Sequence, residues 1–497
     1  MSEGAPSGDA GISQGRDGRT RLPSWRWEAL RTTFWLLPTV LVIGAGLLFV
    51  VTLEIDWAAY HHHLHLPFWI ESGSADAARQ VLIAIAAAVI TVVGVVFSIT
   101  ILALTLASQQ FGPRMMRNFI RDVGNQLTLA IFVATFVYSV LALVSITSIS
   151  RRPDFVPHLS VTVSEGLLLV DLAVLIYFIH HIAKSIQLPE VIAGIGRDLS
   201  RAIEAEFPLL DRHEVGPAPM GRDRPIPELL KLLDDRGGIV TAGTSGYIQF
   251  VGYGQLVAIA SRADAVIRLN HGSGHFVVAG SPLATVWPRG AAEQVRLALA
   301  KAHVTGPHRT LMQDPVFAID QLVEIAIRAL SPAVNDPFTA LTCIDWLSAG
   351  LSQLSGRELS EGIYRDRSDE IRLIEFAPSY ERMVNRAFDK VRQAGAAMPA
   401  VVIRLLDAIT HVVEHTVEPS QRQVLRRQAD MILRAADAAV AETNDLDDIH
   451  RRHDRLVSLI ALSDEDPGSD RAESSDGRTE SSVAHAETMA GRLRGAR

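Results

Sequence analysis

The hydrophobic and polar positions divide this chain into an apolar first third and a mixed remainder. Residues 81–107 contain no charged side chain, and further apolar stretches lie at 34–53, 127–149 and 163–182. At a rise of about 1.5 Å per residue, about 20 residues in a helix cross a hydrocarbon layer roughly 30 Å thick. A helix that is apolar on every side is typical of a membrane span. The pattern therefore predicts four transmembrane helices within residues 30–185.

Beyond residue 186 the pattern changes to that of a domain folded in water. Apolar residues at helical spacing after Gln187 predict that the fourth span continues as an amphipathic helix. Short β-prone runs separated by glycines predict a small β module at 237–288. Further helices are predicted at 291–303, 320–330, 335–353, 379–394, 399–416, 419–443 and 445–461, with a strand at 370–376. The predicted fold class is a membrane α-helical bundle of four transmembrane helices plus a C-terminal α+β cytoplasmic domain over 186–462.

The two ends of the chain and its overall charge limit the choice of partners. Residues 1–29 and 463–497 are rich in small and charged residues, which predicts disorder. The whole chain is 48% hydrophobic and 21% charged, and its formal net charge is −8. Nucleic-acid binding would need a basic face, which this composition does not supply. We therefore predict the lipid bilayer as the partner of the first third, and no nucleic acid.

Positive charges around the spans predict the orientation. The segments before the first span, between the second and third, and after the fourth carry nine of the flanking Lys and Arg residues, against three in the opposite loops. This asymmetry favours a cytoplasmic location for both termini, with Arg151 and Arg152 as the exception. The single cysteine, Cys343, excludes an internal disulfide and suits the cytoplasm.

Polar residues inside the spans are the first candidates for function. Thr91, Ser98 and Thr105 follow one another at intervals of seven residues, so they share one face of the second span. In the fourth span, Asp171 lies well inside the apolar stretch and His181 lies near its cytoplasmic end. Because a carboxylate deep in a bilayer costs a few kcal/mol, Asp171 should face protein or water. Two interpretations stay open: hydrogen bonds that fix the bundle, or an ion or proton path.

A second group of polar residues lies in the soluble half. Asp320, Glu324 and Arg328 fall at i, i+4 and i+8 of a predicted helix and can pair along one face. Asn335 and Asp336 precede Pro337, which predicts a new helix with Asp336 as its cap and the proline in its first turn. These five polar residues are candidates either for bonding between helices or for a ligand pocket.

Histidine clusters raise the question of a metal. His411 and His415 lie four apart in an HxxEH sequence, the inverted zinc-peptidase arrangement. A working zinc site needs a third protein ligand, and the valines of this segment look like core residues, so the pair is a weak candidate. The histidines at 61, 62, 63 and 65 are interpreted as a surface cluster of the loop after the first span. No nucleophile with an identifiable base stands out, and neither a cofactor nor an enzymatic activity is predicted.

Two long strings resemble a known family. SQQFGPRMMRNFIRDVGNQLTLAIFVATF at 108–136 and AIDQLVEIAIRALSPAVNDPFTA at 318–340 are similar to the bacterial membrane proteins grouped as domain of unknown function 2254. The similarity runs from about residue 30 to about residue 460. It implies several N-terminal spans, a cytoplasmic region and a bacterial inner membrane. The family has no established activity, so no catalytic residue is carried over.

Two functions from different classes are consistent with these observations. Four such helices seldom enclose a pore alone, so a homo-oligomer is expected, with the hydroxyl stripe of the second span at its centre. The leading hypothesis is an oligomeric channel or transport-like assembly with a cytoplasmic regulatory domain. The alternative is a membrane-anchored sensor or scaffold that binds a ligand or partner near residues 320–336. A membrane zinc hydrolase is a remote third.

Overall fold

The computed structural model describes residues 36–62, 73–111, 122–149, 155–209, 226–359, 362–375 and 379–465. The predictions for residues 1–29, for His63 and His65, and for the tail beyond residue 465 lie outside these ranges. The chain divides into two compact units, Met1–Val191 and Ile192–Arg497, which are described in turn.

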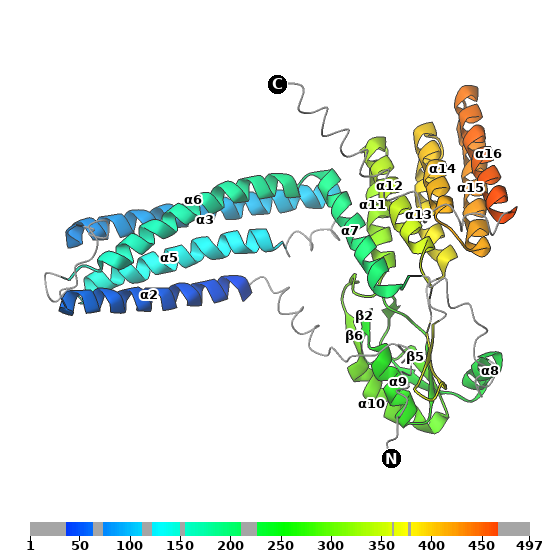
Figure 1. The fold of residues 1–497 in the computed structure, drawn as a ribbon, viewed down its shortest axis with the longest axis horizontal. Helices are drawn as coiled ribbons and strands as arrows, with labels where there is room; N and C mark the ends of the chain where they lie inside the picture. The colour runs from blue at the N-terminus through cyan, green and yellow to red at the C-terminus, as the bar shows by residue number, and fades with distance from the viewer. Residues whose placement is uncertain are drawn as a thin grey trace, which may run out of the picture. The chain divides into compact units, whose positions relative to one another are not determined.

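The first unit is a bundle of long apolar helices (Figure 1). Its members are α2 (Leu36–His62), α3 (Ala75–Phe111), α5 (Val123–Ile149) and α6 (His158–Ser185). Among the residues described, these four helices are long and apolar enough to cross a membrane, which confirms the four predicted spans. Each helix extends beyond its predicted apolar stretch, because residues that flank a span can keep helical backbone hydrogen bonds.

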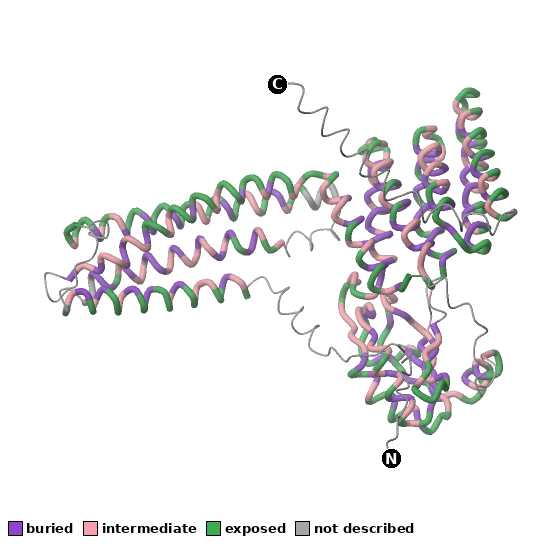
Figure 2. The backbone as a smooth tube through the Cα atoms, viewed as in Figure 1, coloured by how far each residue is buried: buried purple, intermediate pink, exposed green. Residues whose placement is uncertain are grey.

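The helix α5 packs against each of the other three helices of this unit. Buried side chains form one cluster around Leu82 and Tyr138 and another around Phe132 and Phe178. Figure 2 shows buried turns recurring between exposed and intermediate ones along α2 and α5. The exposed turns carry large aliphatic side chains, for example Ile43 and Leu47 on α2. An apolar surface of this extent is stable in lipid and unfavourable in water.

The fourth span does not continue into the next helix without a break, contrary to the prediction. The helix α6 ends at Ser185, and α7 (Leu188–Glu206) begins after a turn at Ile186 and Gln187. Pro189 explains the break, because a proline has no N–H and is accommodated in the first turn of a helix but not in its interior. The predicted amphipathic face is present, since Ile192, Ile195 and Leu199 are buried.

The second unit contains two small sheets. Their strands are β1 (Gly238–Thr241), β2 (Gly246–Val251), β3 (Val266–Leu269), β4 (Phe276–Val277), β5 (Pro282–Trp287), β6 (His303–Gly306), β7 (Ile363–Arg365) and β8 (Ile371–Ile374). The first sheet has the order β1-β5-β3-β8-β7 and the second β4-β2-β6. Strand β8 pairs in parallel with β3, with Ile267 opposite Leu373. The predicted module at 237–288 is therefore completed by β6 and by two strands from much later in the chain.

Helices cover these sheets and build the rest of the unit. Beside the strands lie α8 (Ile226–Arg236), α9 (Tyr253–Arg262), the short 3₁₀ helix η2 (Arg289–Ala291) and α10 (Ala292–Ala302). Then follow α11 (Pro315–Ala329), α12 (Pro337–Ser355), α13 (Tyr380–Gly395), α14 (Pro399–Glu414), α15 (Pro419–Ala439) and α16 (Thr443–Glu465). The odd-numbered helices α11, α13 and α15 form one row, and α12, α14 and α16 form a second row (Figure 1).

The starts of these helices follow from local sequence. Asp314 caps α11 and Asp336 caps α12, and each is followed by a proline in the first turn. The side chain of Asp336 accepts a hydrogen bond from the N–H of Thr339 at 3.2 Å. The predicted cap and first-turn proline at residues 336 and 337 are confirmed. The aspartate accepts a hydrogen bond from a free N–H group of the helix start, and the proline has no N–H that would need a partner.

Candidate functional site

Polar side chains line the contact between α5 and α6. The hydroxyl of Thr135 on α5 donates to Oδ1 of Asp171 on α6 at 3.0 Å. The hydroxyls of Ser139 and Ser164, on the same two helices, lie 2.6 Å apart. All four residues are buried. We call Thr135, Ser139, Ser164 and Asp171 the polar seam.

Asp171 is the residue of the polar seam that is hardest to explain by packing. It lies in the middle of α6, and only 2% of its surface is exposed. Its Oδ1 accepts the bond from Thr135, whereas no described residue donates to its buried Oδ2. A buried polar atom without a partner costs about 1–3 kcal/mol, and more when the group is charged. The mid-span carboxyl is therefore a costly group whose free oxygen can accept a proton.

A second buried carboxylate lies where α2 and the start of α6 meet. Asp56 accepts hydrogen bonds from the N–H groups of Leu159 at 2.8 Å and Ser160 at 3.0 Å, and from the Ser160 hydroxyl at 2.7 Å. The hydroxyl of Thr52 lies 3.2 Å from that of Ser160 and 2.9 Å from that of Tyr138. We call Thr52, Asp56, Tyr138 and Ser160 the Asp56 cluster. Its carboxylate satisfies the free N–H groups at the start of α6.

At the other end of α6, His181 meets Asp122, which directly precedes α5. Nε2 of His181 lies 2.9 Å from Oδ1 of Asp122. The contact requires glycine at position 124, because a methyl group there would lie 2.6 Å from that nitrogen. Nearby, Asn125 is 6% exposed, and neither end of its amide has a partner among the residues that the structure describes.

The hydroxyl stripe of α3 does not join the polar seam. Thr91, Ser98 and Thr105 are exposed. Each donates to the carbonyl four residues earlier in its own helix: at 2.7 Å to Ala87, at 2.8 Å to Gly94 and at 2.9 Å to Ile101. The helix buries the face that carries Leu82 and Val89, and at 100° per residue Thr91 lies opposite Leu82. The structure thus brings Asp171 and His181 to α5, and leaves the stripe on the surface of the bundle.

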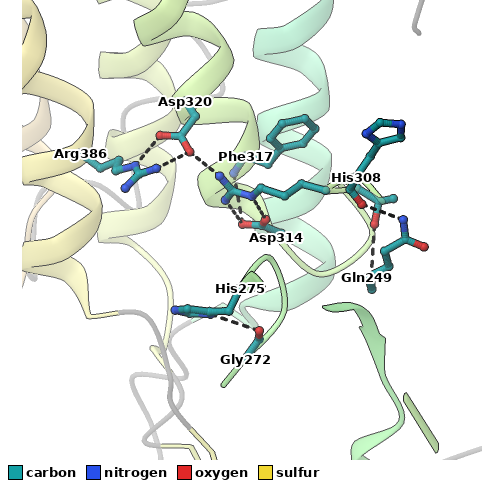
Figure 3. Close-up of polar contacts among 10 residues, drawn as sticks. Gln249, Gly272, His275, His308, Asp314, Phe317, Asp320 and Arg386 are labelled. Carbon is teal, nitrogen blue, oxygen red and sulfur yellow. Dashed lines mark hydrogen bonds and ion pairs between the residues drawn. The ribbon is translucent and has the colours of Figure 1, made fainter. Parts of the chain in front are cut away.

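In the second unit, Arg309 binds Asp314, the cap of α11, and Asp320 within α11. Figure 3 shows both aspartates together with Arg386. Its Nε and Nη2 donate to the two carboxylate oxygens of Asp314 at 2.7 and 2.9 Å, and its Nη1 donates to Asp320 at 2.5 Å. Asp320 also accepts two hydrogen bonds from Arg386 of α13, one of them at 2.8 Å. The guanidinium lies 5.1 Å from the ring centre of Phe317. We call Arg309, Asp314, Asp320 and Arg386 the Arg309 network.

The two carboxyl groups of the network differ electrostatically. Burial raises the pKa of Asp314, which is 3% exposed, by more than the bonds from Arg309 lower it. Burial acts on Asp320 in the same direction, but the guanidinium groups of Arg386 and Arg309 outweigh it and hold the pKa of Asp320 below its usual range. Two cations and two anions leave the network neutral, so its charges stabilise one another and link the loop after β6 to α11 and α13.

A tight loop lies beside this network. Gly274 has a φ of +83°, and a methyl group there would lie 2.1 Å from Oδ2 of Asp314. Nδ1 of His275 lies 3.1 Å from the carbonyl oxygen of Gly272, a contact marked in Figure 3. Burial lowers the pKa of this histidine. Only glycine permits this approach of the loop to the Asp314 carboxylate.

The other candidates from the second unit lie at separate places. Asp336 caps α12, and Asn335 occupies the preceding turn with a φ of +49°. Glu324 and Arg328 lie on α11, and neither is unpaired. Of the five predicted residues, Asp320 is the one placed in the Arg309 network, because its partners come from other elements.

The histidine pair of the HxxEH sequence is exposed. His415 follows the last residue of α14, and its Nδ1 lies 2.8 Å from the carbonyl of His411. Within the described ranges, no group of three or more His, Cys, Asp or Glu side chains is placed to hold a metal ion. The prediction that the histidine cluster lies in a loop is wrong for His61 and His62, which are the last residues of α2. The ring of His61 stacks on that of Trp57, one turn earlier in the same helix, with ring centres 5.1 Å apart.

Comparison with known proteins adds the family. A family model described as "Predicted membrane protein (DUF2254)" matches residues 31–411. The chain belongs to this family. The DUF2254 match includes all four apolar helices, the polar seam and the Arg309 network.

Two mycobacterial relatives of this DUF2254 protein have names without a functional description. "Uncharacterized protein Mb1321c" of Mycobacterium bovis and "Uncharacterized protein Rv1290c" of Mycobacterium tuberculosis are each 34% identical to it over 383 residues. The aligned region covers 75% of this chain and 71% of each relative. No solved structure matches the chain. Any functional conclusion must therefore come from the residues themselves.

Proposed function

We propose that this DUF2254 protein is a transport-like membrane protein in which ions move along the polar seam between α5 and α6. The observation that carries the proposal is Asp171, a mid-span carboxyl with one oxygen bonded to Thr135 and the other without a described donor. A hydrogen bond that only fixes the bundle could be made by a neutral side chain at a smaller desolvation cost. Ionisable groups at this depth are typical of ion and proton pathways.

The position of the neighbouring polar groups supports a path through the length of the bundle. Ser164 lies two turns from Asp171 along α6, and Ser160 of the Asp56 cluster lies one turn further. In the other direction, His181 lies about 15 Å from Asp171 along the helix axis. The buried Thr128 and Asn125 of α5 fall within that interval. Polar groups thus accompany α6 from one end to the other.

We further propose a homo-oligomer in a bacterial inner membrane, with both termini in the cytoplasm and the second unit as a regulatory domain. The exposed hydroxyl stripe of α3 supports the oligomer, because Thr and Ser on a lipid-facing surface allow close packing between helices of different copies. In this proposal each copy has its own path, and the stripe serves assembly. The excess of Lys and Arg in the three loops on one side supports the orientation.

A second candidate function is a membrane-anchored sensor or scaffold. Its support is an exposed apolar pair at the start of α12, where Val334 lies in the turn before the helix and Phe338 in its first turn. Rows of helical hairpins offer extended surfaces to a partner. Under this alternative, Phe338→Ser would abolish photo-crosslinking to a partner in cells and leave any ion flux unchanged.

The experiment for the leading proposal measures charge movement in liposomes that contain the purified full-length protein. Gradients of H⁺, Na⁺, K⁺ and Cl⁻ are applied in turn on a solid-supported membrane. We expect a current with at least one ion, its loss in Asp171→Asn, and its retention in Glu165→Gln. Glu165 is a matched control, because it is an exposed carboxylate on the same helix and the charge change is identical. The absence of current under every gradient, or an unchanged current in Asp171→Asn, would refute the proposal.

A further inference from the structure

We infer that the transported ion is the proton and that Asp171 is the group that carries it across the middle of the membrane. This inference rests on the proposed function and names the ion for the same site. Three features of the first unit lead to it: the number of oxygen atoms at Asp171, the width of the polar seam, and the groups at its two ends.

The oxygen atoms at Asp171 are too few for a metal cation. The described contacts give the two carboxylate oxygens and the hydroxyl of Thr135, and that hydroxyl is engaged in donating to Oδ1. A dehydrated cation needs about six oxygen ligands in place of its water shell, as calcium and magnesium sites illustrate. A proton needs one oxygen, and Oδ2 of Asp171 is available for it.

The width of the polar seam also discriminates between ions. At 2.6 Å, the hydroxyls of Ser139 and Ser164 are in direct hydrogen-bonding contact. A sodium or potassium ion could pass this point only if α5 and α6 moved apart. A proton passes by exchange instead, because each hydroxyl can accept one hydrogen bond while it donates another. The contact that excludes a metal ion is therefore able to conduct a proton.

Titratable groups lie at both ends of the polar seam. Towards the start of α6 lie Asp56 of α2 and Tyr138 of α5, which contact Ser160 and Thr52 of the Asp56 cluster. Towards the end of α6 lies His181, in contact with Asp122. Between Val81 and Leu106, α3 contributes no titratable side chain. Glu165 and His180 of α6 are exposed. An imidazole takes up a proton at one nitrogen and releases one from the other, which suits His181 to exchange protons with water.

The transfer itself is a movement of protons without oxidation or reduction. A hydronium ion or a protonated His181, acting through water, gives up a proton, and an O–H bond forms at Oδ2 of Asp171. The neutral carboxyl group then breaks its O–H bond, and the carboxylate is restored. Ser164 and Ser139 each accept a proton as they give up their own, and water on the far side takes up the last proton as a hydronium ion. The proton gradient or the membrane potential supplies the driving force, so no further reactant is consumed.

The experiment uses the full-length protein in liposomes that contain the pH indicator pyranine. A potassium diffusion potential, set by valinomycin, drives protons inward, while uptake of ²²Na⁺ and ⁸⁶Rb⁺ is followed in parallel samples without valinomycin. We expect acidification with the wild type and with Glu165→Gln, and acidification at the rate of protein-free liposomes with Asp171→Asn. Uptake of both tracers should stay at the protein-free rate in every sample.

A second variant protects the test against misfolding. Ser164→Ala keeps Asp171 and removes the hydroxyl contact with Ser139. Since a methyl group cannot relay a proton, acidification should fall by about tenfold or more. Each variant is compared with the wild type by its elution profile in detergent. If Asp171→Asn does not elute like the wild type, the acidification rate of Ser164→Ala decides whether the inference holds. An unchanged acidification rate in Ser164→Ala would overturn the inference.

The remaining outcomes separate the inference from the proposed function. If tracer uptake depends on Asp171 while acidification does not, ions do move along the polar seam but the proton is the wrong ion. If neither acidification nor tracer uptake exceeds the protein-free rate, and a Cl⁻ gradient also gives no current, the proposed function itself fails. If acidification persists in Asp171→Asn but is lost in a variant of another polar residue, Asp171 is not the carrier.

Discussion

Replacement of Arg309 by methionine tests whether the Arg309 network stabilises the second unit as a buried ion-pair system. Methionine retains much of the aliphatic length and removes the guanidinium. Asp314, which is 3% exposed, would lose both hydrogen bonds from Arg309 and keep the N–H of Phe317 at 3.2 Å. Asp320 would keep its bonds from Arg386. The substitution thus leaves one buried carboxyl group without its counter-charge.

The expected cost can be estimated from burial. Removing one partner of a buried ion pair costs about 3–5 kcal/mol. The side chains of Arg309 and Asp320 are 18% and 15% exposed, and Asp314 can take up a proton because burial raises its pKa. The partial exposure of the pair and the protonation of Asp314 both reduce the cost, so we expect the lower limit of about 3 kcal/mol. A loss of this size makes local opening of the fold around Arg309 roughly 100-fold more frequent.

An exposed pair provides the matched control. Arg404 of α14 donates to Asp345 of α12 at 2.8 and 3.0 Å, and these side chains are 41% and 50% exposed. The same substitution, Arg404→Met, should cost less than about 1 kcal/mol, because exposed ion pairs contribute little in water.

The assay is hydrogen exchange, followed by mass spectrometry, on the full-length protein in detergent. In Arg309→Met, the slowest amides of peptides covering 309–325 and 380–390 should exchange roughly 100-fold faster, and in Arg404→Met less than about fivefold faster for the peptides around that pair. Adding Asp314→Asn to Arg309→Met should recover at least half of the lost free energy, because asparagine keeps the cap of α11 and carries no charge. Equal effects of the two methionine variants, or a double variant as unstable as Arg309→Met alone, would refute the reasoning.

Three further predictions concern single sites in the second unit. Gly196→Ala should destabilise the packing of α7 on α12 by about 1–3 kcal/mol, since the new methyl would lie 2.1 Å from Cε3 of Trp346. The control Gly194→Ala, on the same helix, should be neutral or stabilising. Thermal unfolding monitored by tryptophan fluorescence measures both, and the opposite order of stability would contradict the prediction. Cys343 is buried, and burial raises the pKa of its thiol to about 12. Maleimide should therefore label the folded protein at pH 7 at least about 100-fold more slowly than the denatured protein. Equal labelling rates would disprove the burial of Cys343. Because the pKa of Asp320 is lowered in the folded state, its ion pairs stabilise the fold above about pH 4 and lose this effect as the pH falls through the folded-state pKa. The rate of hydrogen exchange in the 309–325 peptide, corrected for intrinsic rates, should therefore rise below about pH 4. If the same rise persisted in Asp320→Asn, another group would be responsible.

The features that could be predicted from sequence are those that depend on one segment at a time. A run such as 81–107 is too long and too apolar for a helix in water, so its location follows from its own composition. The cap and proline at residues 336 and 337 act within one helical turn, and the structure has them as predicted. The seven-residue spacing on α3 likewise predicted a shared face, and the three hydroxyls do share one.

The predictions were less complete where distant segments meet. Strand β8 joins β3 across about a hundred residues, and the short run around Leu373 contains no signal for its partner. Asp122 and Asp56 were not recognised as candidates, because each lies in a polar stretch at the end of a span and gains significance from His181 or Ser160 on α6. Arg309 was missed for the same reason, since its partners lie on α11.

By itself, the sequence of this DUF2254 protein determined which segments are long and apolar enough to cross a membrane. It also placed the starts of α12 to α16 within about two residues, whereas it missed α8 and began α11 at residue 320 instead of Pro315. Finally, it required that Asp171 face protein or water inside the membrane. Hydropathy and capping are properties of neighbouring residues, so no fold is needed to recognise them. The tertiary structure alone decided that Asp171 meets Thr135 and that the α3 hydroxyls face away from the bundle. The reason is that a buried polar group is satisfied by whichever helix packs against it, and that choice depends on the whole bundle.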